Sequence, residues 1–267
     1  MSLVSHRTRY VIGIIILAAL IFFIYIMSLD YRGVPVLNYH LISSREMNAL
    51  AITPQEFEEQ MLYLRNNGYT AISPDQLVNY IQYNEPLPEK PVLITFDDGY
   101  RDTFSEAYPI LKKYNLVATV FLITDYVGDN DRYLTWEQVK EMHANGIIFG
   151  SHTLNHVSLV DASPEYAEYQ LTKSREGIEW RLKEPVKYFA YPGGFYNQAI
   201  IQLVKKAGYS AAFTTNMGRA RSDSNLFALP RIPIFKAFHT FTSFRLRLKF
   251  TQLVIDANAL RKFLTYK

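Results

Sequence analysis

Two clusters of polar residues in this sequence could do hydrolytic chemistry, and the first is a pair of carboxylates. Asp97 and Asp98 directly follow the apolar run at residues 92–96, and Gly99 comes next. Adjacent carboxylates at the carboxyl end of a buried strand lie where parallel α/β enzymes place their active sites. A solvated surface turn remains the alternative for this segment alone, because Asp-Gly is a common turn pair.

The second cluster is the segment SHTLNH at residues 151–156, which also follows a predicted buried strand. His152 and His156 are four residues apart, and side chains at that spacing share one face of a helical turn. Two imidazoles held in this way suit the binding of one zinc ion. One surface histidine and one capping histidine would give the same pattern without a metal.

Taken together, the two clusters are more specific than either one alone. Two histidines and one aspartate would supply three protein ligands and leave a fourth metal position open for water, as in catalytic zinc sites. The neighbouring aspartate would then be free to act as a base. The combination therefore favours a metal-dependent hydrolase.

The segments TFDDG at 95–99 and SHTLNH at 151–156 together resemble the first two motifs of the polysaccharide deacetylases of carbohydrate esterase family four. The resemblance runs from about Val34 to Phe235. It implies that Asp97 is the general base and that a divalent metal is bound by Asp98, His152 and His156. Zinc is the expected metal, with cobalt and nickel as alternatives. It also implies an α/β fold, a distorted (β/α)7-type barrel.

The segment YFAYPGG at residues 188–194 is similar to the third motif of the family but departs from it. Much of the family has an arginine in place of Ala190, which usually orients the base. A tyrosine usually stands where this chain has Gly193, and its implied role, a backbone N–H to the oxyanion, survives any side chain. The altered form resembles the branch that acts on poly-N-acetylglucosamine. Arg231 is the candidate replacement for the missing arginine, and a surface arginine at a strand edge is the alternative.

The general acid of the family is usually a histidine in a late Leu-x-His motif, which this chain matches poorly. His239 lies at about that place. His40 ends the first predicted strand and should also face the barrel mouth, and residues 36–40 resemble the beginning of the poly-N-acetylglucosamine branch. Either histidine could instead be structural or solvated. Four aromatic residues could stack on sugar rings or belong to the core: Tyr100, Tyr191, Phe195 and Tyr196.

The surrounding sequence alternates strands and helices, and these elements must position the residues above. Strands are expected at 34–39, 69–72, 92–96, 118–123, 147–149, 187–190 and 209–213. Cap-and-proline pairs at 53–54, 73–74 and 163–164 open helices between them. Alternation of this kind predicts parallel strands, and about seven units favour a distorted, incompletely closed barrel over an open doubly wound sheet. No glycine-rich phosphate loop follows the first strand, which argues against a nucleotide partner.

Residues 10–29 form an apolar run without a charge, and about 20 such residues are enough to cross a membrane. Arg7 and Arg9 precede the run, so the positive-inside rule predicts a cytoplasmic N-terminus and an extracellular catalytic domain. A cleaved signal peptide is the alternative, although its small-x-small site is missing. The predicted division is a cytoplasmic terminus at 1–9, a transmembrane anchor at 10–29, the catalytic domain at 30–240 and a basic C-terminal segment at 241–267.

Composition narrows the remaining classes of function. The net charge of +3 is too weak to indicate a nucleic-acid partner, and the lack of cysteine excludes disulfides and thiolate ligands. Apolar and basic residues alternate over 244–250, which predicts an edge strand. A solvated basic face is the favoured interpretation of this stretch, and a face that lies on an anionic membrane or wall polymer is the alternative.

The predicted function is hydrolytic N-deacetylation of a polysaccharide that contains N-acetylglucosamine, either poly-N-acetylglucosamine or peptidoglycan, outside a single-pass cell membrane. In the implied mechanism Asp97 takes a proton from a metal-activated water, and a histidine protonates the leaving amine. An O-acetyl esterase on xylan-like glycans and a non-catalytic glycan-binding relative are the alternatives. The intact base and three intact ligands argue against the second of these.

Overall fold

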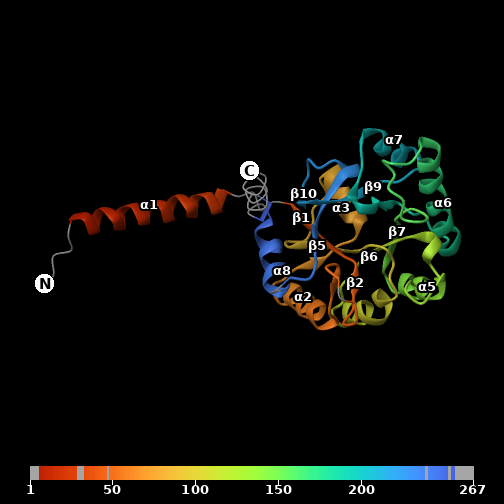
Figure 1. The fold of residues 1–267 in the computed structure, drawn as a ribbon, viewed down its shortest axis with the longest axis horizontal. Coiled ribbons are helices and arrows are strands. Elements are labelled where there is room, and N and C mark those ends of the chain that lie inside the picture. Colours follow the sequence, from red (N-terminus) through yellow and green to blue (C-terminus); the bar gives the residue numbers. More distant parts are fainter. Residues whose placement is uncertain (1–5, 29–32, 47, 238–239, 252–253, 256–267) are drawn as a thin grey trace.

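The computed structural model of the chain describes all residues except 1–5, 29–32, 47, 238–239, 252–253 and 256–267. Helix α1 (His6–Ser28) lies apart from a rounded body that holds the other elements (Figure 1). A sheet runs through the centre of this body, and helices surround it. The predicted site residues that the structure describes all belong to this body, outside α1.

The central sheet is mostly parallel and closes on itself. Strand β1 pairs in parallel with β11 on one side and with β5 on the other, which completes a ring of seven strands. The expected distorted seven-stranded barrel is therefore observed. Around the ring the strands are β1 (Val34–Tyr39), β11 (Leu229–Pro233), β9 (Ala211–Met217), β8 (Tyr188–Ala190), β7 (Ile148–Ser151), β6 (Thr119–Leu122) and β5 (Pro91–Phe96).

One member of the ring differs from the prediction. The expected strand at 69–72 is the short β4 (Thr70–Ala71), which pairs with β5 outside the ring. Its place in the barrel is taken by β11, whose Pro230 and Pro233 argue against a central strand because proline cannot donate to a ladder. Strand β10 (Arg219–Ala220) pairs antiparallel with β1, and β2 (Leu41–Ile42) pairs with β3 (Ala51–Ile52) in a small separate sheet.

Side chains alternate across each strand of the barrel, and this alternation sorts the core into two layers. Leu37 and Phe96 belong to the larger layer, which packs against surrounding helices. Val36, Leu93 and Phe121 belong to the smaller layer. Polar side chains continue along this second face: Asn38 follows Val36 in the alternation, and Thr95 follows Leu93. The second face of the strands therefore becomes polar toward their carboxyl ends.

The surrounding helices begin where the sequence signals predict. Thr53 and Ser73 both form capping boxes, in which the cap side chain and the third helical residue bond each other's backbone N–H groups. The helices are α2 (Pro54–Asn66), α3 (Pro74–Tyr83), the π-helical turn η1 (Thr103–Ala107) running into α4 (Tyr108–Tyr114), α5 (Trp136–Ala144), α6 (Pro164–Leu182), α7 (Gln198–Lys206) and α8 (Thr240–Lys249), with short 3₁₀ turns η2 (Thr124–Tyr126), η3 (Pro192–Gly194) and η4 (Leu226–Ala228).

The predicted edge strand over 244–250 is wrong, because this segment lies in helix α8 and the residue that follows it. Phe244 and Leu248 are buried and four residues apart, so they share one helical face that packs toward α2. The ring of Phe244 contacts the ring of Tyr63, and the Arg245 guanidinium lies over the same tyrosine. The segment is a helix because its buried residues have helical spacing, although its charged residues alternate as in a strand.

Helix α1 carries the apolar run from which the membrane anchor was predicted. Its apolar side chains from Tyr10 to Phe22 are largely exposed. In the residues whose placement is described, no helix meets the combined length and apolarity needed to cross a membrane. The transmembrane anchor at 10–29 is therefore not confirmed, and it stays a prediction, as do the domain limits.

Candidate active site

The predicted site residues follow the carboxyl ends of different barrel strands. Asp97 and Asp98 come directly after β5, His152 after β7 and His40 after β1. Because these strands are parallel, their carboxyl ends meet at one mouth of the barrel. Residues from distant parts of the chain are brought together there.

Asp98, His152 and His156 form a cluster that could hold a metal ion. Their candidate ligand atoms all lie within 4.8 Å of one another. Asp98 Oδ1 is 3.4 Å from His152 Nε2 and 3.4 Å from His156 Nε2. This oxygen is buried and has no hydrogen-bond partner among the residues that the structure describes. Buried polar atoms are rarely left unpaired, so an oxygen without a hydrogen-bond partner is what a metal ligand would leave here.

The surroundings of His152 prepare it for metal binding. Its Nδ1 lies 2.7 Å from the Ala190 carbonyl oxygen, which can only accept, so Nδ1 carries the hydrogen and Nε2 keeps its lone pair toward Asp98. Burial lowers the pKa of His152, which favours the neutral ring that a metal requires. Two neutral imidazoles and one carboxylate form a donor set that suits zinc and related divalent ions.

The backbone of this cluster is held in an uncommon conformation. Asp98 has a φ of 72°, Thr153 of 68° and His156 of 62°, in the left-handed region that residues other than glycine seldom adopt. Neighbouring bonds support the loop: the Thr153 hydroxyl accepts from the His156 N–H at 3.0 Å, and Gln170 Oε1 accepts from the Leu154 N–H at 3.0 Å. Strained residues of this kind persist where the surroundings fix them, often at functional sites.

Arg231 lies against Asp97 in a buried, two-pronged ion pair. Its Nη1 and Nη2 donate to Asp97 Oδ1 and Oδ2, each at 2.7 Å, and neither side chain is more than 2% exposed. Burial raises the pKa of Asp97, but the charge and hydrogen bonds of Arg231 outweigh it and hold this pKa well below its usual range. The burial of Arg231 rules out the alternative of a surface arginine, while its role in catalysis stays a prediction.

Two residues that the sequence interpretation missed complete the surroundings of Asp97. Asn38 Nδ2 donates to Asp97 Oδ2 at 3.3 Å, and the Thr95 hydroxyl accepts from Arg231 Nη1 at 3.2 Å. Both are fully buried polar residues within apolar strands. That contrast is the signal by which they could have been found, because a buried polar group needs a partner.

The two candidate general acids differ in what the structure describes. His40 Nε2 lies 3.9 Å from Asp97 Oδ2, and the His40 side chain is 16% exposed. His40 Nδ1 is buried and has no hydrogen-bond partner within the described part of the chain. His239 lies outside the described residues. His40 therefore stands beside the base, and which histidine acts as the acid stays open.

Gly193 lies in the 3₁₀ turn η3, which is separated from the end of β8 by Tyr191 alone. Its φ is 63°, and a Cβ added there would come within 2.7 Å of the Phe195 ring. A side chain at this position would meet both a strained backbone and that ring. A tyrosine, which the family usually has here, would be strained in this backbone conformation and would require Phe195 to move, and Gly193 itself is exposed.

The four aromatic candidates for sugar stacking have different surroundings. Tyr191 is fully buried, and its hydroxyl donates to the Phe227 carbonyl at 2.9 Å. Its ring belongs to the core, so the predicted stacking on Tyr191 is wrong for this conformation. Phe195 is 61% exposed next to Gly193. Tyr196 and Tyr100 are half-buried, and burial together with the charge of Asp98 raises the pKa of Tyr100.

Comparison with known proteins places these features in a wider group. A family model described as polysaccharide deacetylase matches residues 84–212. The Bacillus subtilis protein YxkH, named as a polysaccharide deacetylase, is 37% identical over 200 residues, which cover 75% of this chain and 71% of the relative. The poly-β-1,6-N-acetyl-D-glucosamine N-deacetylase of Staphylococcus aureus is 30% identical over 227 residues, with 78% of each chain covered. The solved structure of the Streptococcus pyogenes deacetylase PplD in complex with acetate has a TM-score of 0.76 and 32% identity, and covers 82% of this chain and 98% of PplD.

Proposed function

Because the chain belongs to the polysaccharide deacetylase family and is a hydrolase of that kind, we propose that it removes N-acetyl groups from a polysaccharide containing N-acetylglucosamine. Poly-N-acetylglucosamine is the first candidate, and peptidoglycan is the second. The observation that carries the proposal is the pairing of the Arg231–Asp97 fork with the Asp98, His152 and His156 cluster at one barrel mouth. The likeness to the Staphylococcus aureus relative supports the choice of polymer.

The proposed mechanism begins with the three residues that would hold the metal. Asp98, His152 and His156 would bind a divalent ion, with zinc the first candidate. Such an ion lowers the pKa of a bound water from 15.7 to about 7, which makes hydroxide available at neutral pH. The Ala190 carbonyl keeps His152 in the tautomer that this binding requires.

Asp97 is the proposed general base. The Arg231 fork keeps its carboxylate ionised, and together with Asn38 it fixes the orientation of the two oxygens. An ionised carboxylate held beside the metal ligand Asp98 can accept a proton from the attacking water. Proton transfer to a positioned group of this kind is typically worth about 10²–10⁴ in rate.

Two further groups complete the proposed reaction. The backbone N–H of Gly193, an exposed residue, would donate to the developing oxyanion, a role that needs no side chain. His40 is the favoured acid for the leaving nitrogen, because its Nε2 lies 3.9 Å from Asp97 Oδ2 and so faces the same space. His239 is the alternative acid. The products would be acetate and a free glucosamine amine on the polymer.

Acetate release from defined substrates tests the proposed activity. The purified metal-loaded protein should release acetate from N-acetylglucosamine oligomers with β-1,6 linkage. Release from peptidoglycan fragments instead would move the substrate to the wall polymer. Release from acetylated xylan alone would indicate an O-acetyl esterase, and no release from any of the three would contradict the proposal.

The proposal includes an extracellular catalytic domain on a membrane anchor at residues 10–29. Arg7 and Arg9 before the apolar run support a cytoplasmic N-terminus. The exposed apolar side chains of α1, apart from the barrel, support an apolar environment for this helix (Figure 1). Protease added to intact cells should degrade the catalytic domain. A protected domain would contradict this topology, and a mature chain that begins near Asp30 would indicate a cleaved signal.

A further inference from the structure

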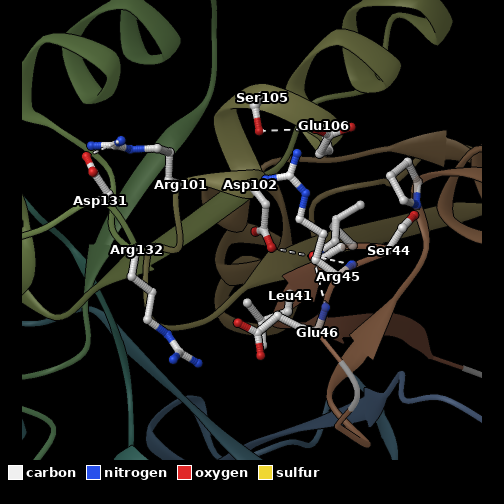
Figure 2. A pocket seen from close by; sticks show the side chains of 13 residues that line it. Leu41, Ser44, Arg45, Glu46, Arg101, Asp102, Ser105, Glu106, Asp131 and Arg132 are labelled. Atoms are coloured by element: carbon white, nitrogen blue, oxygen red, sulfur yellow. Dashed lines mark hydrogen bonds and ion pairs between the residues drawn. The ribbon is translucent and has the colours of Figure 1, made fainter.

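A cavity of about 510 Å³ lies between the β2–β3 segment and the π-helical turn η1 (Figure 2). Its walls are rich in charged side chains, among them Arg45, Glu46, Arg101, Asp102, Glu106 and Arg132. None of these residues has a part in the mechanism above. The cavity is therefore a second concave site whose contents the proposed reaction does not explain.

Two chain segments connect the cavity wall to the candidate active site. Leu41 and Ile42 of its wall directly follow His40, and its Arg101 and Asp102 follow the segment that carries Asp97 and Asp98. Arg132 provides a third link, because its guanidinium lies 5.2 Å from the centre of the Tyr100 ring. The negative charge of Asp98 in turn contributes to the raised pKa of the Tyr100 hydroxyl. A polymer whose reacting unit lies at the metal cluster could place a neighbouring unit in this cavity.

Asp102, a residue of the cavity wall, has one carboxylate oxygen without a hydrogen-bond partner among the described residues. One oxygen, Oδ2, accepts from the Ile42 N–H at 3.1 Å. The other, Oδ1, is buried and has no hydrogen-bond partner within the described ranges. Figure 2 shows Asp102 among the residues that line the cavity, with its carboxyl group near the centre of the view. A buried acceptor left unpaired is destabilising, so a donor from a bound ligand would be stabilising there.

The charges around Asp102 favour a cationic donor over a neutral one. Burial, with smaller contributions from the negative charges of Glu106 and Glu46, raises the pKa of Asp102 to about 7. Two of the arginines are engaged elsewhere: Arg101 pairs with Asp131 at 2.7 Å, and Arg132 lies over Tyr100. Figure 2 shows Arg101 turned away from Asp102. Glu106 and Glu46 therefore place negative charge near Asp102, while Arg45 and Arg132 are the cations that share this cavity wall.

The backbone beside Asp102 is also unusual. Residues Thr103–Ala107 form a π-helical turn, and Asp102 directly precedes it. Turns of this kind are rare and frequently lie at functional sites. Ser105 and Glu106 of the same turn reach the cavity wall. The turn therefore brings Glu106 to the same cavity as Asp102.

We propose that this cavity is a subsite for a glucosamine unit next to the reacting unit, in which Asp102 accepts a hydrogen bond from the protonated amine. This proposal rests on the proposed function, because deacetylation is the reaction that places such an amine on the polymer. An ammonium group offers three donors and a positive charge, whereas an acetamide offers one N–H and an added acetyl group. The enzyme would then prefer units whose neighbour has already been deacetylated.

Matched oligomers test this preference directly. The substrates are a fully N-acetylated pentamer and the same pentamer with one free amine beside the reacting unit. Wild-type protein should show a kcat/KM several times higher on the second, and Asp102→Asn should reduce this ratio to about one. Glu165→Gln removes an exposed carboxylate from the start of α6, away from the cavity, and should keep the wild-type ratio.

Two further measurements keep the test independent of folding and of activity. The asparagine oxygen of Asp102→Asn can still accept from the Ile42 N–H, so this variant keeps the backbone contact of the wild type. Glu106 makes no hydrogen bond to Ile42 N–H, and Glu106→Gln should partly reduce the ratio of kcat/KM on the two pentamers. Fully deacetylated β-1,6-glucosamine pentamer, titrated into the metal-loaded protein by calorimetry, should bind wild type at least about tenfold more tightly than Asp102→Asn. This titration needs no turnover.

The outcomes separate the subsite from the proposed function. Absence of acetate release from every oligomer, with glucosamine binding that depends on Asp102, would contradict the reaction and leave the subsite standing. Equal kcat/KM of wild type on the two pentamers, or unchanged glucosamine binding by Asp102→Asn, would overturn the subsite. Equal weakening of acetylated and free oligomers would assign the cavity to sugar hydroxyls and overturn the recognition of the amine.

Discussion

The guanidinium of Arg231 and the carboxylate of Asp97 meet in parallel hydrogen bonds of 2.7 Å, although 134 positions separate them in the chain. Arg231 comes from β11 and Asp97 from the end of β5, and both strands flank β1 in the barrel. Closure of the barrel therefore creates this contact. The orientation of the proposed base, Asp97, therefore depends on the correct placement of β11, the last barrel strand.

Replacement of Arg231 by lysine should lower kcat sharply, by roughly 10²-fold or more, because lysine keeps the charge but cannot form the planar fork. The metal content should remain near that of wild type, since Arg231 is not among the candidate ligands. Acetate release and elemental analysis on the same preparation give both values. Wild-type turnover in Arg231→Lys would show that the fork has no part in catalysis.

Removal of the metal should abolish activity and lower the melting temperature, because ligand binding stabilises the folded state by mass action. Prolonged treatment with a chelator, followed by dialysis, gives the metal-free protein. Addition of zinc, cobalt or nickel in separate samples should restore both properties and rank the three metals. A chelated protein that keeps full turnover would show that the reaction needs no metal.

Replacement of His40 by glutamine should reduce kcat by about 10²–10⁴ if His40 is the general acid, while the metal stays bound. The same substitution at His239 is the matched comparison. Measurement of kcat and metal content in both variants decides between them. A large loss in the His239 variant with near-normal turnover in His40→Gln would transfer the role to His239.

The stability of the protein should depend on pH through Asp102. Its pKa is raised to about 7 in the folded state by burial, compared with about 4 in an unfolded chain. The folded state therefore binds this proton more tightly, and the resulting stabilisation is fully present below about pH 4 and is lost as the pH rises through about 7. Asp102→Asn carries no titrating group there.

The difference in unfolding free energy between Asp102→Asn and wild type should therefore shift in favour of the variant between pH 4 and pH 8, by at most about 4 kcal/mol. Urea denaturation of both proteins across this range measures the shift. Because all other titrating groups are common to the two proteins, their contributions cancel to first order. A difference that stays constant with pH would show that Asp102 has an ordinary pKa.

The sequence was most informative where motif residues directly follow apolar strands. Asp97, Asp98 and His152 could be placed at one barrel mouth because parallel strands end on the same side. The partner of Asp97 was harder to find, since β11 contains two prolines and its pairing depends on closure of the whole barrel. The sequence alone therefore leaves a surface arginine as the alternative for Arg231, and its complete burial excludes that alternative.

Other features depend on contacts that no local pattern carries. The burial of Tyr191 results from packing on Tyr196 and a bond to the Phe227 carbonyl, 36 positions away. The cavity around Asp102 depends on the Ile42 backbone, 60 positions earlier in the chain. For α8, the buried pair Phe244 and Leu248 has helical spacing within a segment that also alternates. Packing of this buried pair toward α2 favours the helix over the strand that the alternation would fit.

The most direct test of the account compares the two neighbouring aspartates, to which it assigns different work. Asp98 Oδ1 faces both histidines, so Asp98→Ala should lose the metal and the activity together. Asp97 faces Arg231 and Asn38, so Asp97→Asn should keep near-stoichiometric metal and lose about 10²–10⁴ in turnover. Metal analysis and acetate release on both purified proteins are the measurement. Loss of metal from Asp97→Asn with retention in Asp98→Ala would reverse the assignment, and full metal and turnover in both would contradict a hydrolase centre at this barrel mouth.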